Sequence, residues 1–264
     1  MKAETPSTPN DKSAPQYEER LVCFINLLGF KSAIDESVSN VRLLSALHES
    51  LSQFEGSRLV NLLHESVPVL TSKGEFTSAG EAGTTALVQK QWPIAVTQFS
   101  DSFVLSCPAT NPGSCLMLLR AIDALQKVFF WQLGMLMRGG VSKGALIHIQ
   151  GGPLFGPAMN EAYALESKLA IYPRVLFDPQ AAVLLHQIWG TEAFPLFDAF
   201  DGHKAMDLIS CLWLKHQHEP QDLDKFSEQL KGVENDIAEN SRASLPKVKY
   251  LEDRLQQLQL SVNQ

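Results

Sequence analysis

The chain has 264 residues, a formal net charge of −7 and an apolar content of 45%, with 19% charged residues. This composition is typical of a folded protein with a substantial core, and the acidic balance argues against a nucleic-acid groove, which needs a basic stripe. No apolar run approaches the ~18–20 residues that span a bilayer, so we expect no membrane partner.

The polar, Pro- and Ser-rich residues 1–17 predict a disordered tail rather than a signal peptide. The four cysteines sit singly in apolar runs without CxxC spacing, which predicts buried thiols in a reducing compartment. Together these features predict a cytoplasmic protein. We expect one domain over residues 18–264, with a core at about 20–178 and a C-terminal extension at 179–264.

The predicted elements alternate between strands and helices. We expect a buried strand at 20–28, a helix capped by Ser39 or Asn40, strands at 94–99 and 103–107, a helix opening at Asn111-Pro112, and a strand at 136–149. This order predicts an α+β fold, a βαββαβ unit with helices on one face of a largely antiparallel sheet. A loop is expected at 71–85. A helix at 161–171, a strand at 174–177, a helix at 179–188 and an amphipathic C-terminal helix complete the chain.

Two polar residues interrupt the apolar strands. Asp101 lies at the tip of the predicted hairpin, where aspartate is commonly a turn residue. The alternative is a ligand for Mg²⁺ or Mn²⁺, which prefer hard oxygen donors. Asn26 ends the first strand and precedes a Leu-Leu-Gly-Phe turn, in which Gly29 permits close approach of the backbone to an anion. This turn is a candidate phosphate cradle.

Four short segments occur in the order of four motifs of a known enzyme superfamily. FINLLGF resembles the F-I-D-x-x-G-F opening of the class III nucleotidyl cyclases, and QFSDS resembles their second metal-aspartate hairpin. MRGGVSKGALI is similar to their R-x-G-I-x-x-G strand, and GPAMNEAYALE to their G-x-x-V-N-x-A-x-R-L-E segment. The likeness covers about residues 20–170 and implies a ferredoxin-like catalytic core.

Within that superfamily, the RGG, FGPA, AYALE and AIYPRV segments look most like the pyrimidine cyclases of bacterial Pycsar antiphage systems. The resemblance implies a uridylate or cytidylate cyclase, which converts UTP or CTP into the 3′,5′-cyclic nucleotide and pyrophosphate. The cyclic product acts on a companion effector. The resemblance also implies a homodimer whose active sites lie between subunits, with the metal ligands from one chain and the asparagine segment from the other.

The resemblance assigns roles to matched residues. Asp101 matches the second of two aspartates that hold two divalent ions, Mn²⁺ or Mg²⁺, and Asn26 stands where the first is expected. Asn160 matches the asparagine that orients the ribose. The triphosphate turn contains Leu27, Gly29 and Phe30.

The chain departs from the catalytic pattern at two of these places. Asn26 lacks the charge of an aspartate, so either the site is naturally weakened or the residue was changed deliberately; we favour an inactivating change because the other motifs match. The arginine expected four residues after Asn160 is replaced by Ala164, so another cation must stabilise the transition state. The candidates, each of which can alternatively be a surface charge, are Arg138, Arg174 and Lys143.

The residues expected to contact the nucleotide base also differ from those of the purine cyclases. Thr97 replaces the lysine of purine cyclases, and Pro153 replaces their acidic base-reading residue. A neutral pocket favours a pyrimidine base, with UTP ahead of CTP. Two alternatives remain open: a cyclase-like nucleotide-binding module that does no chemistry, supported by Asn26 and Ala164, and a purine cyclase with a rearranged pocket.

Overall fold

The computed structural model describes residues 15–54, 58–59, 68–70, 76–78, 92–189, 196–210, 221–240 and 245–262. Its main sheet contains β1 (Glu18–Leu28), β4 (Ala95–Phe99), β5 (Ser102–Pro108), β6 (Leu136–His148), β7 (Leu154–Phe155), β8 (Arg174–Phe177), β9 (Phe197–Asp198) and β10 (Lys204–Asp207). A separate pair consists of β2 (Pro68–Leu70) and β3 (Phe76–Ser78). The predicted tail lies outside the described residues up to position 14, and the predicted loop at 71–85 is wrong at 76–78, which pair with β2.

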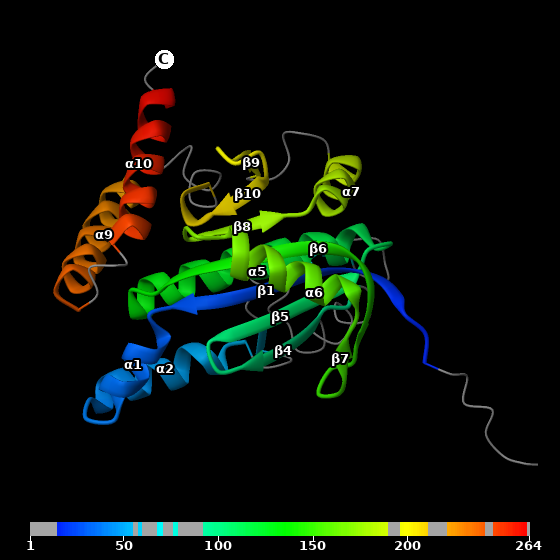
Figure 1. Cartoon of the computed structure of the whole chain (residues 1–264), viewed down its shortest axis with the longest axis horizontal. Helices are drawn as coiled ribbons and strands as arrows, with labels where there is room; N and C mark the ends of the chain where they lie inside the picture. The colour runs from blue at the N-terminus through cyan, green and yellow to red at the C-terminus, as the bar shows by residue number, and fades with distance from the viewer. Residues whose placement is uncertain are drawn as a thin grey trace, which may run out of the picture.

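The strands of the main sheet follow the order β4-β5-β1-β6-β8-β10-β9, with β7 paired to β6 (Figure 1). β1 is antiparallel to both β5 and β6, and β4 is antiparallel to β5. The order β4-β5-β1-β6, with antiparallel neighbours, confirms the ferredoxin-like core. β6 and β8 are parallel, so the chain between them must cross a face of the sheet.

The helices are α1 (Phe30–Ser37), α2 (Val41–Ser52), α5 (Pro112–Leu133), α6 (Pro157–Ala164), α7 (Pro179–Trp189), α9 (Gln221–Asn240) and α10 (Leu245–Val262), and a π-helical turn, η1 (Leu165–Leu169), continues α6. Asn40 caps α2 by accepting a hydrogen bond from the backbone N–H of Leu43 at 3.1 Å. Asn111 caps α5 in the same way, accepting from Ser114 N–H at 3.1 Å. Both caps agree with the sequence pattern, since asparagine is a preferred N-cap residue. α1 and α9 were not predicted.

The two faces of β1 belong to different cores. The odd-numbered residues from Leu21 to Leu27 point to one face of the sheet and join the main core with α2 and α5. The even-numbered residues Val22 and Phe24 point to the other face and pack against Ala158 and Ala162 of α6. The helices of the βαββαβ unit therefore lie on one face, as predicted, and α6 covers part of the opposite face (Figure 1). We call this second surface the α6 face.

The C-terminal helices extend the fold at one end. Val248, Leu251 and Leu255 of α10 are buried in a cluster with Phe130 and Leu136, as the amphipathic pattern predicted. α9 lies beside α10 (Figure 1). Among the described residues, none of the helices combines the length and the apolar character that a membrane span requires.

Candidate active site

Asn26 and Asp101 lie side by side, at the end of β1 and at the tip of the β4–β5 hairpin. Asn26 Nδ2 donates to Asp101 Oδ2 at 3.4 Å. The backbone N–H of Leu27 donates to the Asp101 carbonyl at 2.9 Å, which fixes the tip against β1. Ser100 closes the turn with a left-handed φ of 55°. We refer to the side chains of Asn26 and Asp101 as the ligand pair.

The ligand pair fits one divalent cation when a substrate supplies further oxygens. Asp101 offers a half-buried carboxylate, whose Oδ1 accepts from Ser102 Oγ at 3.4 Å. The Asn26 amide can reverse and direct its oxygen toward the same point, because its oxygen and nitrogen are nearly isosteric. Mg²⁺ is commonly bound by one or two carboxylates plus substrate phosphates. The described residues contain no cluster of three His, Cys, Asp or Glu side chains placed to hold a metal without such help.

Arg138 brings a positive charge next to the ligand pair. Asn26 faces Arg138 across the β1–β6 ladder. Arg138 Nε lies 2.7 Å from Glu166 Oε1 of η1, and its Nη1 donates to the carbonyl of Ala170 at 3.5 Å. Burial raises the pKa of Glu166, the charge of Arg138 opposes that shift, and the negative charge of Asp101 adds to it. The charges of Glu166 and Arg138 therefore form one electrostatic cluster with the ligand pair.

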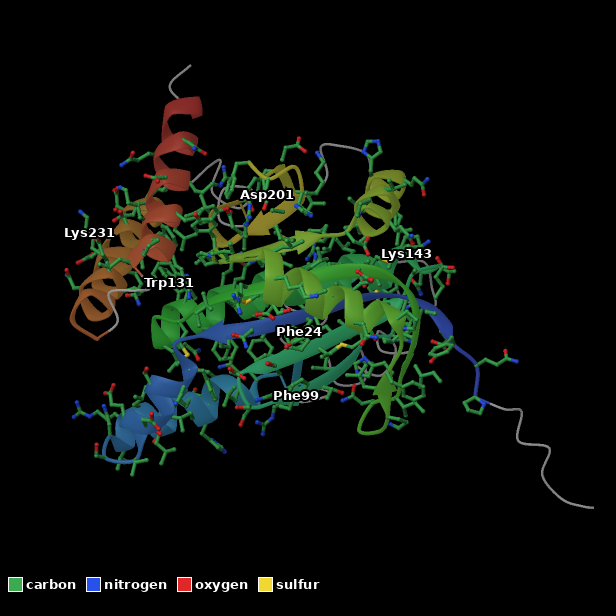
Figure 2. The ribbon with its side chains drawn as sticks, in the orientation of Figure 1. Phe24, Phe99, Trp131, Lys143, Asp201 and Lys231 are labelled. Carbon is green, nitrogen blue, oxygen red and sulfur yellow. The ribbon has the colours of Figure 1, made fainter. Side chains whose placement is uncertain are left out.

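The other two candidate cations lie elsewhere. Arg174 is 1% exposed and forms an ion pair with Asp201. Lys143 forms an ion pair with Glu19, and because it is an odd number of residues from Arg138 along β6, its side chain lies on the other face of the sheet. Lys143 and Asp201 mark these two places in Figure 2. The structure brings neither cation to the ligand pair.

The predicted phosphate turn connects β1 to α1. Gly29 has a φ of 86° and is the N-cap residue of α1. Leu27 and Phe30 bury their side chains, at 2% and 7% exposure, so only their backbones can meet a ligand. A glycine N-cap provides no side chain for the first N–H groups of α1, and such groups favour an anion. The turn thus presents backbone donors at the end of the strand that carries Asn26.

Asn160 is exposed on α6. The helix runs along β6, with Ala158 over Gly144 and Ala162 over Gly140. Among the described residues, no hydrogen bond joins Asn160 to the ligand pair, so within one chain the structure does not unite them. The exposed amide is available to a second molecule.

The α6 face beyond the ligand pair carries aromatic and polar side chains. Phe24 contacts Tyr163 edge-on, with ring centroids 5.2 Å apart. The ring centroids of Phe24 and Phe99 are 6.3 Å apart. Figure 2 labels Phe24 and Phe99. Phe99 and Tyr163 are 48% and 52% exposed. Thr97, two residues before Phe99 on β4, has its Oγ1 2.9 Å from His148 Nε2.

Several of these residues received no role from the sequence. Glu166 lay within the matched AYALE segment without an assigned function, although its acidic character was a visible signal. His148 lay in the strand ALIHI as a histidine without metal spacing. Phe99 and Tyr163 gave no signal, because single aromatic residues in strands and helices are normally core residues.

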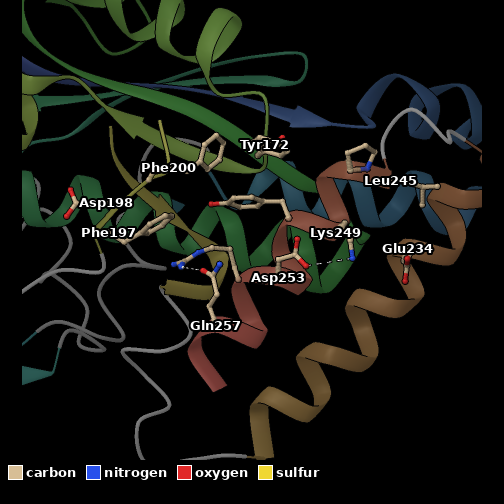
Figure 3. Close-up of a pocket in the computed structure, with 13 residues that line it drawn as sticks. Tyr172, Phe197, Asp198, Phe200, Glu234, Leu245, Lys249, Asp253 and Gln257 are labelled. Atoms are coloured by element: carbon tan, nitrogen blue, oxygen red, sulfur yellow. Dashed lines mark hydrogen bonds and ion pairs between the residues drawn. The ribbon is translucent and has the colours of Figure 1, made fainter. Parts of the chain in front are cut away.

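A pocket of about 860 Å³ lies between α10 and the β9–β10 edge (Figure 3). Its aromatic wall includes Tyr172, Phe200 and Tyr250. The Arg254 guanidinium lies 3.8 Å from the ring centroid of Phe197. None of the residues that line this pocket is a predicted site residue, so the pocket is separate from the candidate site.

No family model and no curated protein matches the chain. Solved structures with a similar fold include a bacterial light-regulated adenylyl cyclase, at 13% identity and a TM-score of 0.44, covering 76% of this chain and 99% of that one. Adenylyl cyclase CyaB from P. aeruginosa has 13% identity and a TM-score of 0.45, covering 73% and 95%. The adenylate/guanylate cyclase/hydrolase from Silicibacter pomeroyi has 12% identity and a TM-score of 0.40, covering 72% and 96%. Similarity at this level concerns the fold and is not an argument about the reaction.

Proposed function

We propose that the chain is a homodimeric pyrimidine nucleotide cyclase, which converts UTP, or CTP as second choice, into the 3′,5′-cyclic nucleotide and pyrophosphate. The product would act as a messenger to an effector in antiphage defence. The observation that carries the proposal is the ligand pair, with Arg138 facing Asn26 on the next strand and the Gly29 turn at the end of the same strand. The four motifs in family order add support.

The chemistry follows from the positions of these groups. The ligand pair would hold a divalent ion, which when bound supplies charge that neutralises the triphosphate and lowers the pKa of the ribose 3′-hydroxyl. The backbone N–H groups after Gly29 bind a phosphate oxygen. Arg138, positioned by Glu166, stabilises the negative charge that develops at the α-phosphate.

The bonds change at one phosphorus atom. The 3′ oxygen bonds to the α-phosphorus, the bond from that phosphorus to the pyrophosphate oxygen breaks, and the hydroxyl proton passes to water. No redox partner is needed. What the protein contributes is position and charge.

Three exposed side chains on α6 and β4 support a dimer. The α6 face carries three exposed side chains near the ligand pair, those of Asn160, Phe99 and Tyr163. A second chain covering this face would bury the two rings and bring its own Asn160 toward the ligand pair of the first. A symmetric pair of chains would then hold two equivalent sites.

The alternative function is a silent nucleotide-binding module. The hydrogen bond from Asn26 Nδ2 to Asp101 Oδ2 favours it, because the amide occupies the carboxylate oxygen that a metal would use. Such a module would bind UTP without turnover.

The test is a turnover assay with the four ribonucleoside triphosphates and Mn²⁺, on the chain and on Asn26→Asp side by side. We expect cyclic UMP or cyclic CMP from Asn26→Asp, and none from Asn26→Asp combined with Asp101→Asn. Asn40→Asp is the matched control, because aspartate caps a helix as well as asparagine and Asn40 lies in a helix cap away from the site. Binding of UTP without turnover by either form would establish the silent module, and cyclic AMP or cyclic GMP would establish a purine cyclase instead.

A further inference from the structure

The C-terminal helix α10 packs close to the candidate active site. Leu28 of β1 and Leu136 of β6 are cross-strand partners, and both belong to the cluster that buries Leu251 of α10. Leu28 lies two residues after Asn26 on β1. Leu136 lies two residues before Arg138 on β6, so all four of these strand side chains share one face of the sheet. In Figure 1, α10 lies at the end of the sheet where β1 ends.

Lys247 lies in the first turn of α10, on the side of the helix that faces the sheet. It is half-buried and stands one helical turn before Leu251, which is fully buried. Burial, with the positive charge of Arg138 as the second cause, lowers the pKa of Lys247. The Lys247 ammonium group is therefore within the electrostatic field of Arg138.

A buried carboxylate fixes the position of α10. Asp207 of β10 is 0% exposed. Arg254 Nε donates to Asp207 Oδ2 at 3.0 Å, and Tyr250 Oη donates to the same oxygen at 3.2 Å. Both donors lie on α10, one and two turns after Lys247. The rotation of the helix that turns Lys247 toward the sheet is thus held by contacts outside the candidate site.

Lys247 has no acidic partner in the part of the chain that the structure describes. Lys249, two residues further along α10, pairs with Asp253 at 3.7 Å, whereas no described carboxylate forms an ion pair with Lys247. Removing an ammonium group from water without a counter-charge costs free energy, and a nearby guanidinium adds to that cost. A lysine in such surroundings beside a candidate site is typical of a functional position.

The other charges around the ligand pair leave Lys247 to a ligand. Glu166 balances Arg138, with 2.7 Å between Oε1 and Nε. A divalent ion held by the ligand pair would balance Asp101. A triphosphate on that ion brings more negative charge than the ion neutralises, and Lys247 is the remaining cation on this side of the site. The anion that fits this arrangement is a polyphosphate.

We propose that Lys247 contacts the outer phosphates of the substrate, so that α10 completes the candidate active site with a second cation beside Arg138. α10 lies outside residues 20–170, which carry the family likeness, and no motif assigned it a role. The inference rests on the proposed function for the place of the metal ion and for the nucleotide part of the ligand.

The first test measures the affinity of the chain for inorganic tripolyphosphate with Mg²⁺ present, by isothermal titration calorimetry. Lys247→Met should raise Kd about tenfold, the effect of one lost charge-assisted hydrogen bond of ~1.4 kcal/mol. Lys247→Arg keeps the positive charge and should retain most of the affinity. Lys249→Met is the matched control, because it makes the same change at an exposed position of the same helix.

Chemical labelling separates a phosphate contact from a purely structural role. We expect tripolyphosphate with Mg²⁺ to reduce the acetylation of Lys247 by acetic anhydride, measured by mass spectrometry, and to leave the acetylation of Lys249 unchanged. Uridine, which has no phosphate, should protect neither lysine. A structural role of Lys247 would not produce protection that depends on phosphate.

The outcomes separate the two proposals. If Lys247→Met and Lys249→Met have the same Kd for tripolyphosphate, or if the chain does not bind it, the inference is overturned. Cyclic UMP from the Asn26→Asp chain would then still establish the proposed function. If tripolyphosphate protects Lys247 but the Asn26→Asp chain neither binds nor converts UTP, the polyphosphate contact stands and the proposed function fails.

Discussion

Arg138 and Glu166 form an ion pair in which the two partners are buried to different extents. The Arg138 side chain is 26% exposed and the Glu166 side chain only 3%, with Nε and Oε1 2.7 Å apart. Glu166 therefore depends on the positive charge of Arg138 more than Arg138 depends on the negative charge of Glu166.

We expect the two single substitutions to be unequal. Arg138→Ala leaves a buried carboxylate without a counter-charge and should lower the free energy of unfolding by about 3–5 kcal/mol. Glu166→Gln keeps the shape and leaves a partly solvated guanidinium, so the loss should be about 1 kcal/mol. Urea unfolding at pH 7 measures both. Equal losses would contradict the asymmetry.

Gly140 and Gly144 offer a matched pair on one face of β6. A Cβ at Gly140 would lie 2.3 Å from the Ala162 carbonyl oxygen and 2.5 Å from Leu165 Cβ, whereas a Cβ at Gly144 would meet Ala158 Cβ at an ordinary 3.5 Å. Gly140→Ala should push α6 off the sheet and destabilise the protein by about 3 kcal/mol. Gly144→Ala should change stability by less than about 1 kcal/mol. Thermal unfolding of the two variants would decide it, and similar melting temperatures would show that α6 is not held this closely.

The elements that the sequence predicted are those with a local signal. β1 is a continuous apolar run, and α5 begins at Asn111-Pro112, where the side chain caps and proline occupies the first turn. α6 begins at Pro157, four residues before the predicted start at Glu161, because Gly156 and Pro157 form a helix start that the apolar spacing does not include. α1 is eight residues long with only Phe30 and Ser37 buried, too short for a periodic stripe.

The candidate site could be predicted only where a motif carried it. The matched segments placed Asn26 and Asp101 together, and the two side chains are hydrogen-bonded although they are 75 positions apart in the sequence; their role as metal ligands stays a prediction. The ion pair between Arg138 and Glu166 could not be predicted from a motif. Glu166 reaches Arg138 only because α6 approaches β6 closely at Gly140. Long-range choices of partner depend on packing, which no local pattern encodes.

Gly29 should resist substitution for a conformational reason. Its φ is +86°, and a Cβ there would meet no atom within 4 Å, so strain alone opposes a side chain. Gly29→Ala should lower the free energy of unfolding by about 1–2 kcal/mol. Gly232, inside α9 and also in open space, is the control: Gly232→Ala should raise stability by about 0.5–1 kcal/mol. Opposite signs in denaturant unfolding are the expected result, and two changes of the same sign would contradict the left-handed turn.

His148 should make stability depend on pH below neutrality. Its pKa falls from 6.5 to about 4 on folding, mainly through burial. Between these values the unfolded chain binds a proton that the folded chain refuses, so the free energy of unfolding decreases as pH falls from about 6.5 to 4 and this contribution levels off below 4. The full effect is about 3 kcal/mol.

His148→Gln removes this titration, so the difference in stability between pH 7 and pH 4.5 should be smaller than in the unchanged chain, as measured by urea unfolding at the two pH values. His186→Gln, at an exposed position on α7, controls for the loss of a histidine. If His148→Gln shows the same pH dependence as the unchanged chain, the inference that His148 is buried in its neutral form is wrong.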